Sequence, residues 1–196
     1  MEQLTPLTEA ERRRAVAYVI ALTANTPIAP QRYERQLLAR YQQGELTVDQ
    51  VLESLDASIY QVLYRSRTAE PWSVTQLQAL LNKSRHYNAA HGITGLLLYS
   101  DGCFVQVLEG PENAVRTLYA NIQQDPRHTQ LLTIREGLGP RRYFADWSMD
   151  FGYVEKQEVE QALDLLYTES TQALVSKDPY LCALLRAFAV EEEATI

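Results

Sequence analysis

The hydrophobic pattern between residues 59 and 153 switches repeatedly between the period of a strand and that of a helix. Strand-like apolar runs cover Ile59–Tyr64, Ile93–Tyr99, Cys103–Leu108, Leu131–Arg135 and Trp147–Tyr153. Helical periodicity covers 73–91 and 111–125. The order β-α-β-β-α-β, followed by one more strand, predicts an α+β fold of the ferredoxin-like type. In that topology the first and third strands are neighbours, and both helices cover one face of the sheet.

The segments on either side of this unit have helical patterns. A capping box at Thr8 predicts a first helix, and two shorter helices are expected over 31–43 and 48–55. Apolar stripes then predict helices over Lys156–Thr168 and Asp178–Val190, which we expect on the opposite face of the sheet. The chain therefore divides into a helical extension (1–57), a central domain (58–154) and a helical cap or output segment (155–196).

Composition and charge exclude several classes of protein. A chain of 196 residues with 46% hydrophobic residues, 8 Gly and 8 Pro is neither disordered nor of low complexity. Its net charge of −7 argues against non-specific nucleic-acid binding, and the acidity gathers in 155–196, a pattern typical of a solvated helix face. No apolar run reaches the roughly 18–20 residues of a membrane span, and no export signal is apparent, so we expect a cytoplasmic protein. Two distant cysteines predict no metal site.

Three polar side chains occupy positions where the pattern predicts apolar ones. Asn88 shares a helix face with Leu77, Leu81 and Ser84, and Gln106 lies within an apolar strand. Because the first and third strands should be adjacent, Tyr64 and Gln106 are expected to meet beneath Asn88. Periodicity alone leaves two interpretations open: a hydrogen-bonded network that fixes the core, or a pocket for a flat ligand that forms hydrogen bonds.

The stretch from Ile59 to Tyr153 closely resembles the BLUF domain, a blue-light sensor that uses flavin. The resemblance rests on Leu63-Tyr-Arg-Ser66, SRHYNAAHGITGLLLY (84–99), FVQVLEG (104–110), DPRH (125–128) and RRYFADWSM (141–149). These motifs occur in the family's order with closely matching spacing, and they span about half of the chain. The two helices that follow resemble the end of the short members of the family, which carry no effector domain. The extension 1–57 departs from the family's usual layout, and we hypothesise that it packs on the sensor or builds an oligomer interface.

The resemblance implies a role for each matching residue. Tyr64 would be the photochemical electron and proton donor, and Gln106 would bridge it to the N5/O4 edge of the flavin. Asn88 would bind the ring at its O4/N3 edge. Trp147 and Met149 would be the signal-output pair, which strand alternation places on one face. The further residues implied to line the flavin pocket are Ser84, Ile93, Phe104, Asp125, Arg127 and His128.

The function implied is that of a blue-light photoreceptor without enzymatic activity. It would bind FAD, with FMN or riboflavin as alternatives, and light would change its homo-oligomeric state, a dimer or larger, or its binding of a protein partner. A flavin-dependent redox enzyme is the alternative, but the chain contains no G-x-G-x-x-G fingerprint. A DNA-binding regulator that uses the helical extension has weak support, because residues 1–43 carry only 6 basic against 4 acidic side chains.

Overall fold

The computed structural model describes residues 7–146, 148–168 and 176–188, which fold into two compact units. One unit contains the chain up to Ile59 together with Gly137–Arg141, and the other contains Tyr60–Glu136 and the chain from Arg142 onward. The predicted output residue Trp147 and the predicted end of the last helix at Val190 lie outside the described residues. Among the helices of the described ranges, none combines the length and the apolar character that crossing a bilayer requires.

The first unit contains three short helices, each of which begins or ends where the sequence predicts. They are α1 (Glu9–Thr23), α2 (Arg32–Gln43) and α3 (Val48–Asp56). The side chain of Thr8 accepts a hydrogen bond from the backbone of Glu11, and the Glu11 carboxylate accepts one from Thr8 N–H in return. Gly44 ends α2 in the left-handed conformation at a φ of 83°. Local capping therefore sets these helix boundaries.

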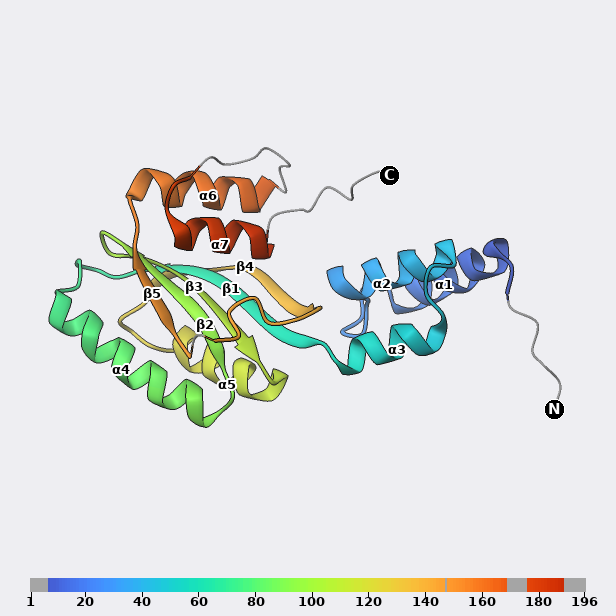
Figure 1. Cartoon of the computed structure of the whole chain (residues 1–196), viewed down its shortest axis with the longest axis horizontal. Coiled ribbons are helices and arrows are strands. Elements are labelled where there is room, and N and C mark those ends of the chain that lie inside the picture. Colours follow the sequence, from blue (N-terminus) through green and yellow to red (C-terminus); the bar gives the residue numbers. More distant parts are fainter. Residues whose placement is uncertain (1–6, 147, 169–175, 189–196) are drawn as a thin grey trace. The chain divides into compact units, whose positions relative to one another are not determined.

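The second unit is built on a five-stranded sheet (Figure 1). Its strands are β1 (Ile59–Arg67), β2 (Thr94–Ser100), β3 (Cys103–Gly110), β4 (Thr129–Gly139) and β5 (Asp150–Tyr153). They lie in the order β4-β1-β3-β2-β5, in which β3 pairs antiparallel with both β1 and β2, and β5 pairs parallel with β2. The ferredoxin-like fold with a fifth strand, predicted from the hydrophobic pattern, is confirmed.

A tight turn between β2 and β3 fixes the register of these two strands. Asp101 and Gly102 both have positive φ angles, of 43° and 77°, as the hairpin turn between right-twisted strands requires. Ser100 then stands opposite Cys103, and Leu97 stands opposite Gln106. The position of Gln106 in the sheet is thus determined close to the turn.

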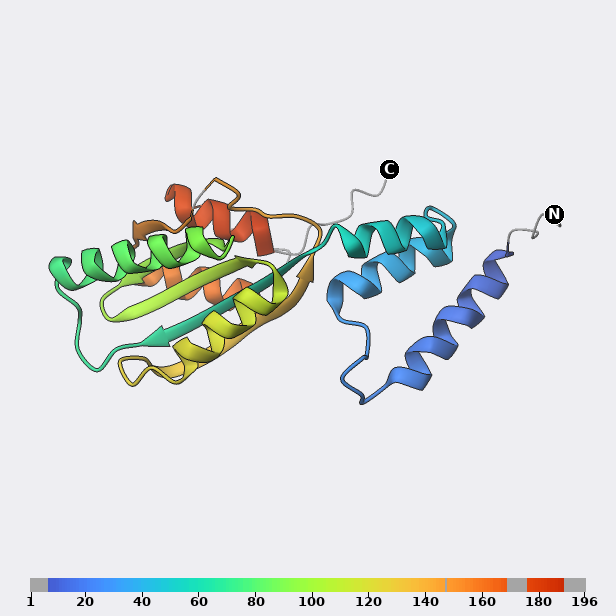
Figure 2. The same ribbon diagram turned by 90° about the horizontal axis from the view of Figure 1, so that it is seen from below.

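Helices cover both faces of this sheet, as the sequence predicts. The helices α4 (Val74–Ala90) and α5 (Glu112–Gln123) lie against one face, and α6 (Lys156–Thr168) and α7 (Pro179–Phe188) lie against the other (Figures 1 and 2). The core on the α6/α7 side is formed by Leu63, Leu96, Leu98, Val105, Val107, Phe144, Val154, Val159, Ala162, Leu163, Leu166, Leu181, Leu184 and Phe188. Since neighbours in a strand point to opposite faces, Tyr64, Phe104 and Gln106 are directed toward α4 and α5.

The α6/α7 layer should contribute substantially to the stability of the fold. Leu181 is fully buried in this core, so Leu181→Ala removes packed methyl groups and leaves a cavity. We expect a loss of about 2–5 kcal/mol in the free energy of unfolding, measured by urea denaturation. Leu132→Ala is the matched control, because Leu132 on β4 is 43% exposed and its truncation should cost less than about 0.5 kcal/mol. Equal losses in the two variants would contradict this assignment of the core.

Candidate functional site

Tyr64 and Gln106 form the centre of the candidate site. They stand directly opposite each other in the antiparallel pair of β1 and β3, and the Tyr64 hydroxyl donates a hydrogen bond to Gln106 Oε1. Both side chains are buried, with exposed fractions of 1% and 7%. Burial raises the pKa of the Tyr64 phenol far above its usual range, so the phenol remains a proton donor at neutral pH. The predicted meeting of these two side chains is confirmed.

Gln106 also forms a second contact, with Met149. Its Nε2 group donates to Met149 Sδ at 3.4 Å, and Met149 is buried. Met149 lies just before β5, because that strand begins at Asp150 and not at Trp147 as the hydrophobic run suggests. The contact with Gln106, rather than strand alternation, therefore shows which way Met149 points.

Asn88 is buried on the inner face of α4, as predicted from the spacing of Leu77, Leu81 and Asn88. Its Nδ2 group donates to the backbone oxygen of Ser148 at 2.8 Å. Its Oδ1 atom is buried and has no hydrogen-bond partner among the residues that the structure describes. An unpaired buried acceptor costs roughly 1–3 kcal/mol, which a ligand that supplies an N–H would recover. Ser84, one helical turn earlier, is half-buried.

The loop after α5 supplies Asp125, Arg127 and His128. The Asp125 carboxylate accepts hydrogen bonds from Arg127 Nε at 2.9 Å and from its backbone N–H at 3.0 Å, and the Arg127 side chain lowers the pKa of Asp125 to about 2. The side chains of Asp125 and Arg127 thus pair with each other. His128 Nδ1 lies 2.9 Å from Ser66 Oγ, and its ring lies 5.6 Å from that of Phe104, centroid to centroid. The structure therefore brings His128 and Phe104 together.

Several residues that the sequence analysis did not single out belong to this region. The Tyr119 ring lies 5.1 Å from the Tyr64 ring, and its hydroxyl shares a 2.6 Å hydrogen bond with Thr133 Oγ1. Arg85 Nε donates to the backbone oxygen of Met149 at 3.0 Å. The four-residue spacing from Val115 could have identified Tyr119 as a buried position. Nothing in the pattern marks Arg85, because its acceptor is a backbone atom.

Glu109, near the end of β3, is wholly buried and holds the segment that leads toward Met149. Its carboxylate accepts hydrogen bonds from Gln61 Nε2 at 2.8 Å and from the backbone N–H groups of Tyr143 and Phe144 at 3.0 and 2.9 Å. Burial raises the pKa of Glu109, although these donors act in the opposite direction. A charged residue inside an apolar strand was a visible signal for this contact.

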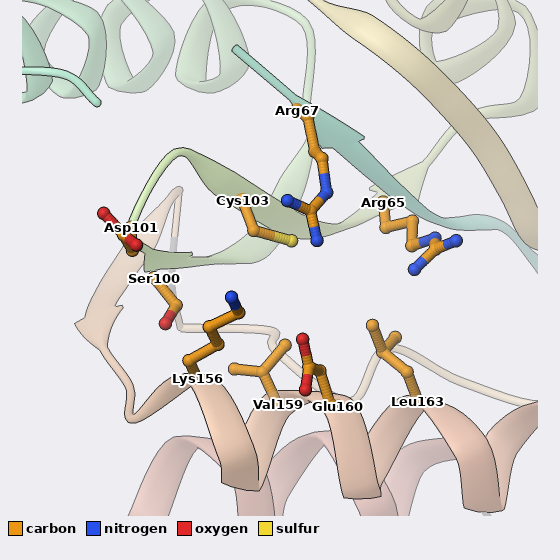
Figure 3. A pocket seen from close by; sticks show the side chains of 9 residues that line it. All are labelled: Arg65, Arg67, Ser100, Asp101, Cys103, Lys156, Val159, Glu160 and Leu163. Carbon is orange, nitrogen blue, oxygen red and sulfur yellow. The ribbon is translucent and has the colours of Figure 1, made fainter. Parts of the chain in front are cut away.

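A separate cavity lies on the other face of the sheet, beneath α6 (Figure 3). Arg65, Arg67 and Cys103 line it from the sheet, and Lys156, Glu160 and Leu163 line it from α6. Its volume of about 20 Å³ admits a water molecule and no organic cofactor. Because Arg65 and Tyr64 are adjacent in β1 and point to opposite faces, this cavity is distinct from the candidate site.

The comparisons with known proteins agree with this geometry. The family model described as BLUF, sensors of blue-light using FAD, matches residues 59–150. The dark-state structure of BlrB, a BLUF protein, is 32% identical, with a TM-score of 0.50, and the match covers 68% of this chain and 96% of that one. The chain belongs to the BLUF family. The resemblance noted from its motifs is thereby confirmed, and with it the flavin-binding, blue-light-sensing character of the family.

Longer BLUF proteins also match. The beta subunit of the photoactivated adenylate cyclase of Euglena longa is 33% identical over 127 residues, which cover 64% of this chain and 15% of the cyclase. The blue light- and temperature-regulated antirepressor BluF of Escherichia coli strain K12 is 26% identical over 133 residues, which cover 67% of this chain and 33% of the antirepressor. This chain therefore corresponds to only a minor part of each of these relatives.

The burial of His128 should make the stability of this BLUF domain depend on pH. Desolvation lowers the pKa of His128, so the unfolded chain binds more protons than the folded one once the pH falls below about 6.5. The free energy of unfolding is therefore highest above about pH 6.5, where the His128 ring is neutral in both states, and it decreases as the pH falls below that value. We expect the free energy of unfolding to fall more steeply between about pH 7.5 and about pH 5.5 in the wild type than in His128→Gln.

Urea denaturation at several pH values measures this difference. His86→Gln is the control, because His86 is exposed on α4, and it should retain the wild-type pH dependence. An identical pH dependence in His128→Gln and the wild type would contradict the prediction.

Proposed function

We propose that this chain is a blue-light photoreceptor that binds a flavin noncovalently, and that Tyr64 and Gln106 carry its photochemistry. The observation that supports this most directly is the buried hydrogen bond from the Tyr64 hydroxyl to Gln106 Oε1. In this buried layer the Tyr64 phenol would donate the electron and the proton. The Gln106 amide, which also contacts the Met149 thioether, would relay the proton. Membership in the BLUF family supports flavin as the ligand that they face.

The residues present fit such a ligand. Within the described part of the chain, Asn88 Oδ1 is a buried acceptor without a partner, and it would suit the N3–H group of an isoalloxazine ring. The buried side chains of Ile93 and Phe104 would form apolar contacts with the ring, and Ser84 would line the pocket. Asp125, Arg127 and His128 would hold the pyrimidine end and the ribityl chain. FAD is the proposed cofactor because the family's description names it; FMN and riboflavin carry the same ring.

The proposed chemistry is a proton-coupled oxidation of Tyr64. When bound, the flavin supplies a ring that blue light converts into a strong one-electron oxidant. Tyr64 would give up an electron to that ring, and its phenolic proton would pass along the existing hydrogen bond to Gln106. When the electron and the proton return to Tyr64, Gln106 would keep a rearranged amide and would offer the bound ring a different hydrogen-bond donor. That change would produce the spectral red shift.

The proposed output is a change in oligomeric state or partner binding, without enzymatic turnover. Met149 would transmit the rearrangement because its Sδ accepts from the Gln106 amide. Trp147, its implied partner in output, lies outside the described residues. In the described part of 155–196, α6 and α7 pack on the reverse of the sheet, and the described part of 1–57 contains α1, α2 and α3. We propose these two segments as the surfaces through which light changes contacts with a second copy or another protein.

Absorption spectra in the dark and just after blue light test the proposed photochemistry. The wild type should show a flavin spectrum that shifts slightly to the red and relaxes in the dark. Tyr64→Phe and Gln106→Leu should abolish the shift while retaining bound flavin, because each removes one end of the proton relay. Tyr60→Phe is the matched control: Tyr60 is a buried tyrosine of the same strand whose hydroxyl binds Glu136, so the red shift should remain.

Two outcomes would contradict the proposal. Bound flavin that bleaches to a reduced form under blue light would indicate instead a flavin-dependent redox enzyme that uses the same pocket. A colourless protein that cannot be reconstituted with flavin would mean that the fold serves binding alone.

Deletion of residues 1–55 tests the proposed role of the helical extension. Light scattering should give a smaller assembly for the truncated protein than for the full chain, in the dark or after blue light, because the α1–α3 surface is lost. The flavin spectrum serves as the control for folding of the remaining domain. An unchanged number of chains per particle together with an unchanged light response would disprove this role.

A further inference from the structure

Three side chains converge on two consecutive residues next to the Tyr64–Gln106 pair. Gln106 Nε2 donates to Met149 Sδ at 3.4 Å, and Asn88 Nδ2 donates to the Ser148 backbone oxygen at 2.8 Å. Arg85 Nε donates to the Met149 backbone oxygen at 3.0 Å. Arg85 and Asn88 are three residues apart on α4 and therefore lie on the same side of the helix. Residues 148 and 149 are thus held from the sheet and from α4 at once.

Within the described residues, Ser148 and Met149 are held by hydrogen bonds from side chains and have no partner in the strand ladder. β5 begins at Asp150, which stands opposite Leu96, so Ser148 and Met149 precede the paired residues. A thioether sulfur is a weak acceptor, so it cannot by itself fix the position of the chain that carries it. The hydrogen bond from a charged guanidinium to a carbonyl oxygen is much stronger. Asn88 holds the preceding residue, Ser148. Of the two hydrogen bonds made by Met149 itself, the one from Arg85, although Arg85 is an exposed residue, is therefore the better suited to keeping Met149 against Gln106.

We propose that Arg85 is a positioning residue that controls the thermal return of the light-activated site. This inference rests on the proposed photochemistry of Tyr64 and Gln106. Arg85 holds the Met149 carbonyl, and through it the sulfur, at the place where the Gln106 amide donates to Sδ. When the light-activated site returns to its dark state, the rearranged Gln106 amide must form its hydrogen bond to Met149 Sδ again. With Arg85 removed, Met149 is held less firmly and the return has a higher barrier.

The test uses the full chain loaded with flavin and follows the decay of the red-shifted absorption after a blue-light pulse. Arg85→Ala should slow dark recovery by about threefold or more, since a barrier increase of the size of one modest hydrogen bond changes a rate by that order. Lys83→Ala is the matched control, because Lys83 is an exposed cation on the same helix, and it should recover at the wild-type rate. Recovery of Arg85→Ala at the wild-type rate or faster would overturn the proposal.

A double-mutant cycle separates positioning from a general effect on the fold. Met149→Leu keeps the apolar volume but removes the sulfur acceptor, so Arg85→Ala should have little further effect on the recovery rate in that background. Additive effects of the two substitutions would overturn the inference. Should Arg85→Ala fail to bind flavin, Arg85→Gln, with its shorter and uncharged side chain, should show the same slowing and the same lack of additivity.

The experiment distinguishes the failure of this inference from that of the proposed function. A wild-type protein without any red-shifted state would refute the photochemistry itself and remove the basis for a role of Arg85. A normal wild-type photocycle with unchanged recovery in Arg85→Ala would refute the positioning role alone.

Discussion

Every contact of the candidate site depends on the register in which β1 and β3 pair. Tyr64 stands opposite Gln106. A slip of one residue would place a valine of β3 opposite Tyr64 and would turn the side chains of the slipped strand to the other face of the sheet. Gln61 and Glu109 stand opposite each other three residues away, and their buried side chains form a hydrogen bond. Because that pair cannot form in any other register, it holds Tyr64 and Gln106 in alignment while the Asp101–Gly102 turn holds β2 against β3.

The polar groups within the sheet layers differ in how fully they are satisfied. The Glu109 carboxylate accepts from Gln61 and from two backbone N–H groups, as a buried charge requires. Gln106 uses its carbonyl for Tyr64 and its amide for Met149. Asn88 Oδ1 is buried, and no described residue donates a hydrogen bond to it. Because the neighbouring polar groups already have partners, a ligand with an N–H group opposite Asn88 Oδ1 would supply the missing hydrogen bond and would be stabilised by it.

The pairing of Tyr64 with Gln106 and the burial of Asn88 could be predicted from the sequence, because both follow from period and topology. The start of the last strand could not. The hydrophobic run begins at Trp147, yet β5 begins at Asp150. Ser148 and Met149, which precede this strand, are held by hydrogen bonds from side chains to their backbone oxygens, such as the one from Arg85 to Met149. The hydrophobic pattern contains no information on backbone acceptors, so it could not predict these bonds. Likewise, the pairing of Asp125 with Arg127 depends on loop geometry that the motif does not encode.

The sheet is a single peptide layer, with different chemistry on its two sides. Tyr64 and Gln106 occupy one side, while Leu63, Val105 and Val107, their neighbours along the same strands, pack in the apolar core beneath α6 and α7. A leucine or valine responds little to a proton or to a hydrogen bond that changes behind it. A hydrogen-bond change at Tyr64 or Gln106 that reached α6 and α7 through this core would therefore arrive there as a displacement of backbone and methyl groups. Under the proposed function, the sheet would pass movement, and not hydrogen bonds, from its α4/α5 face to its α6/α7 face.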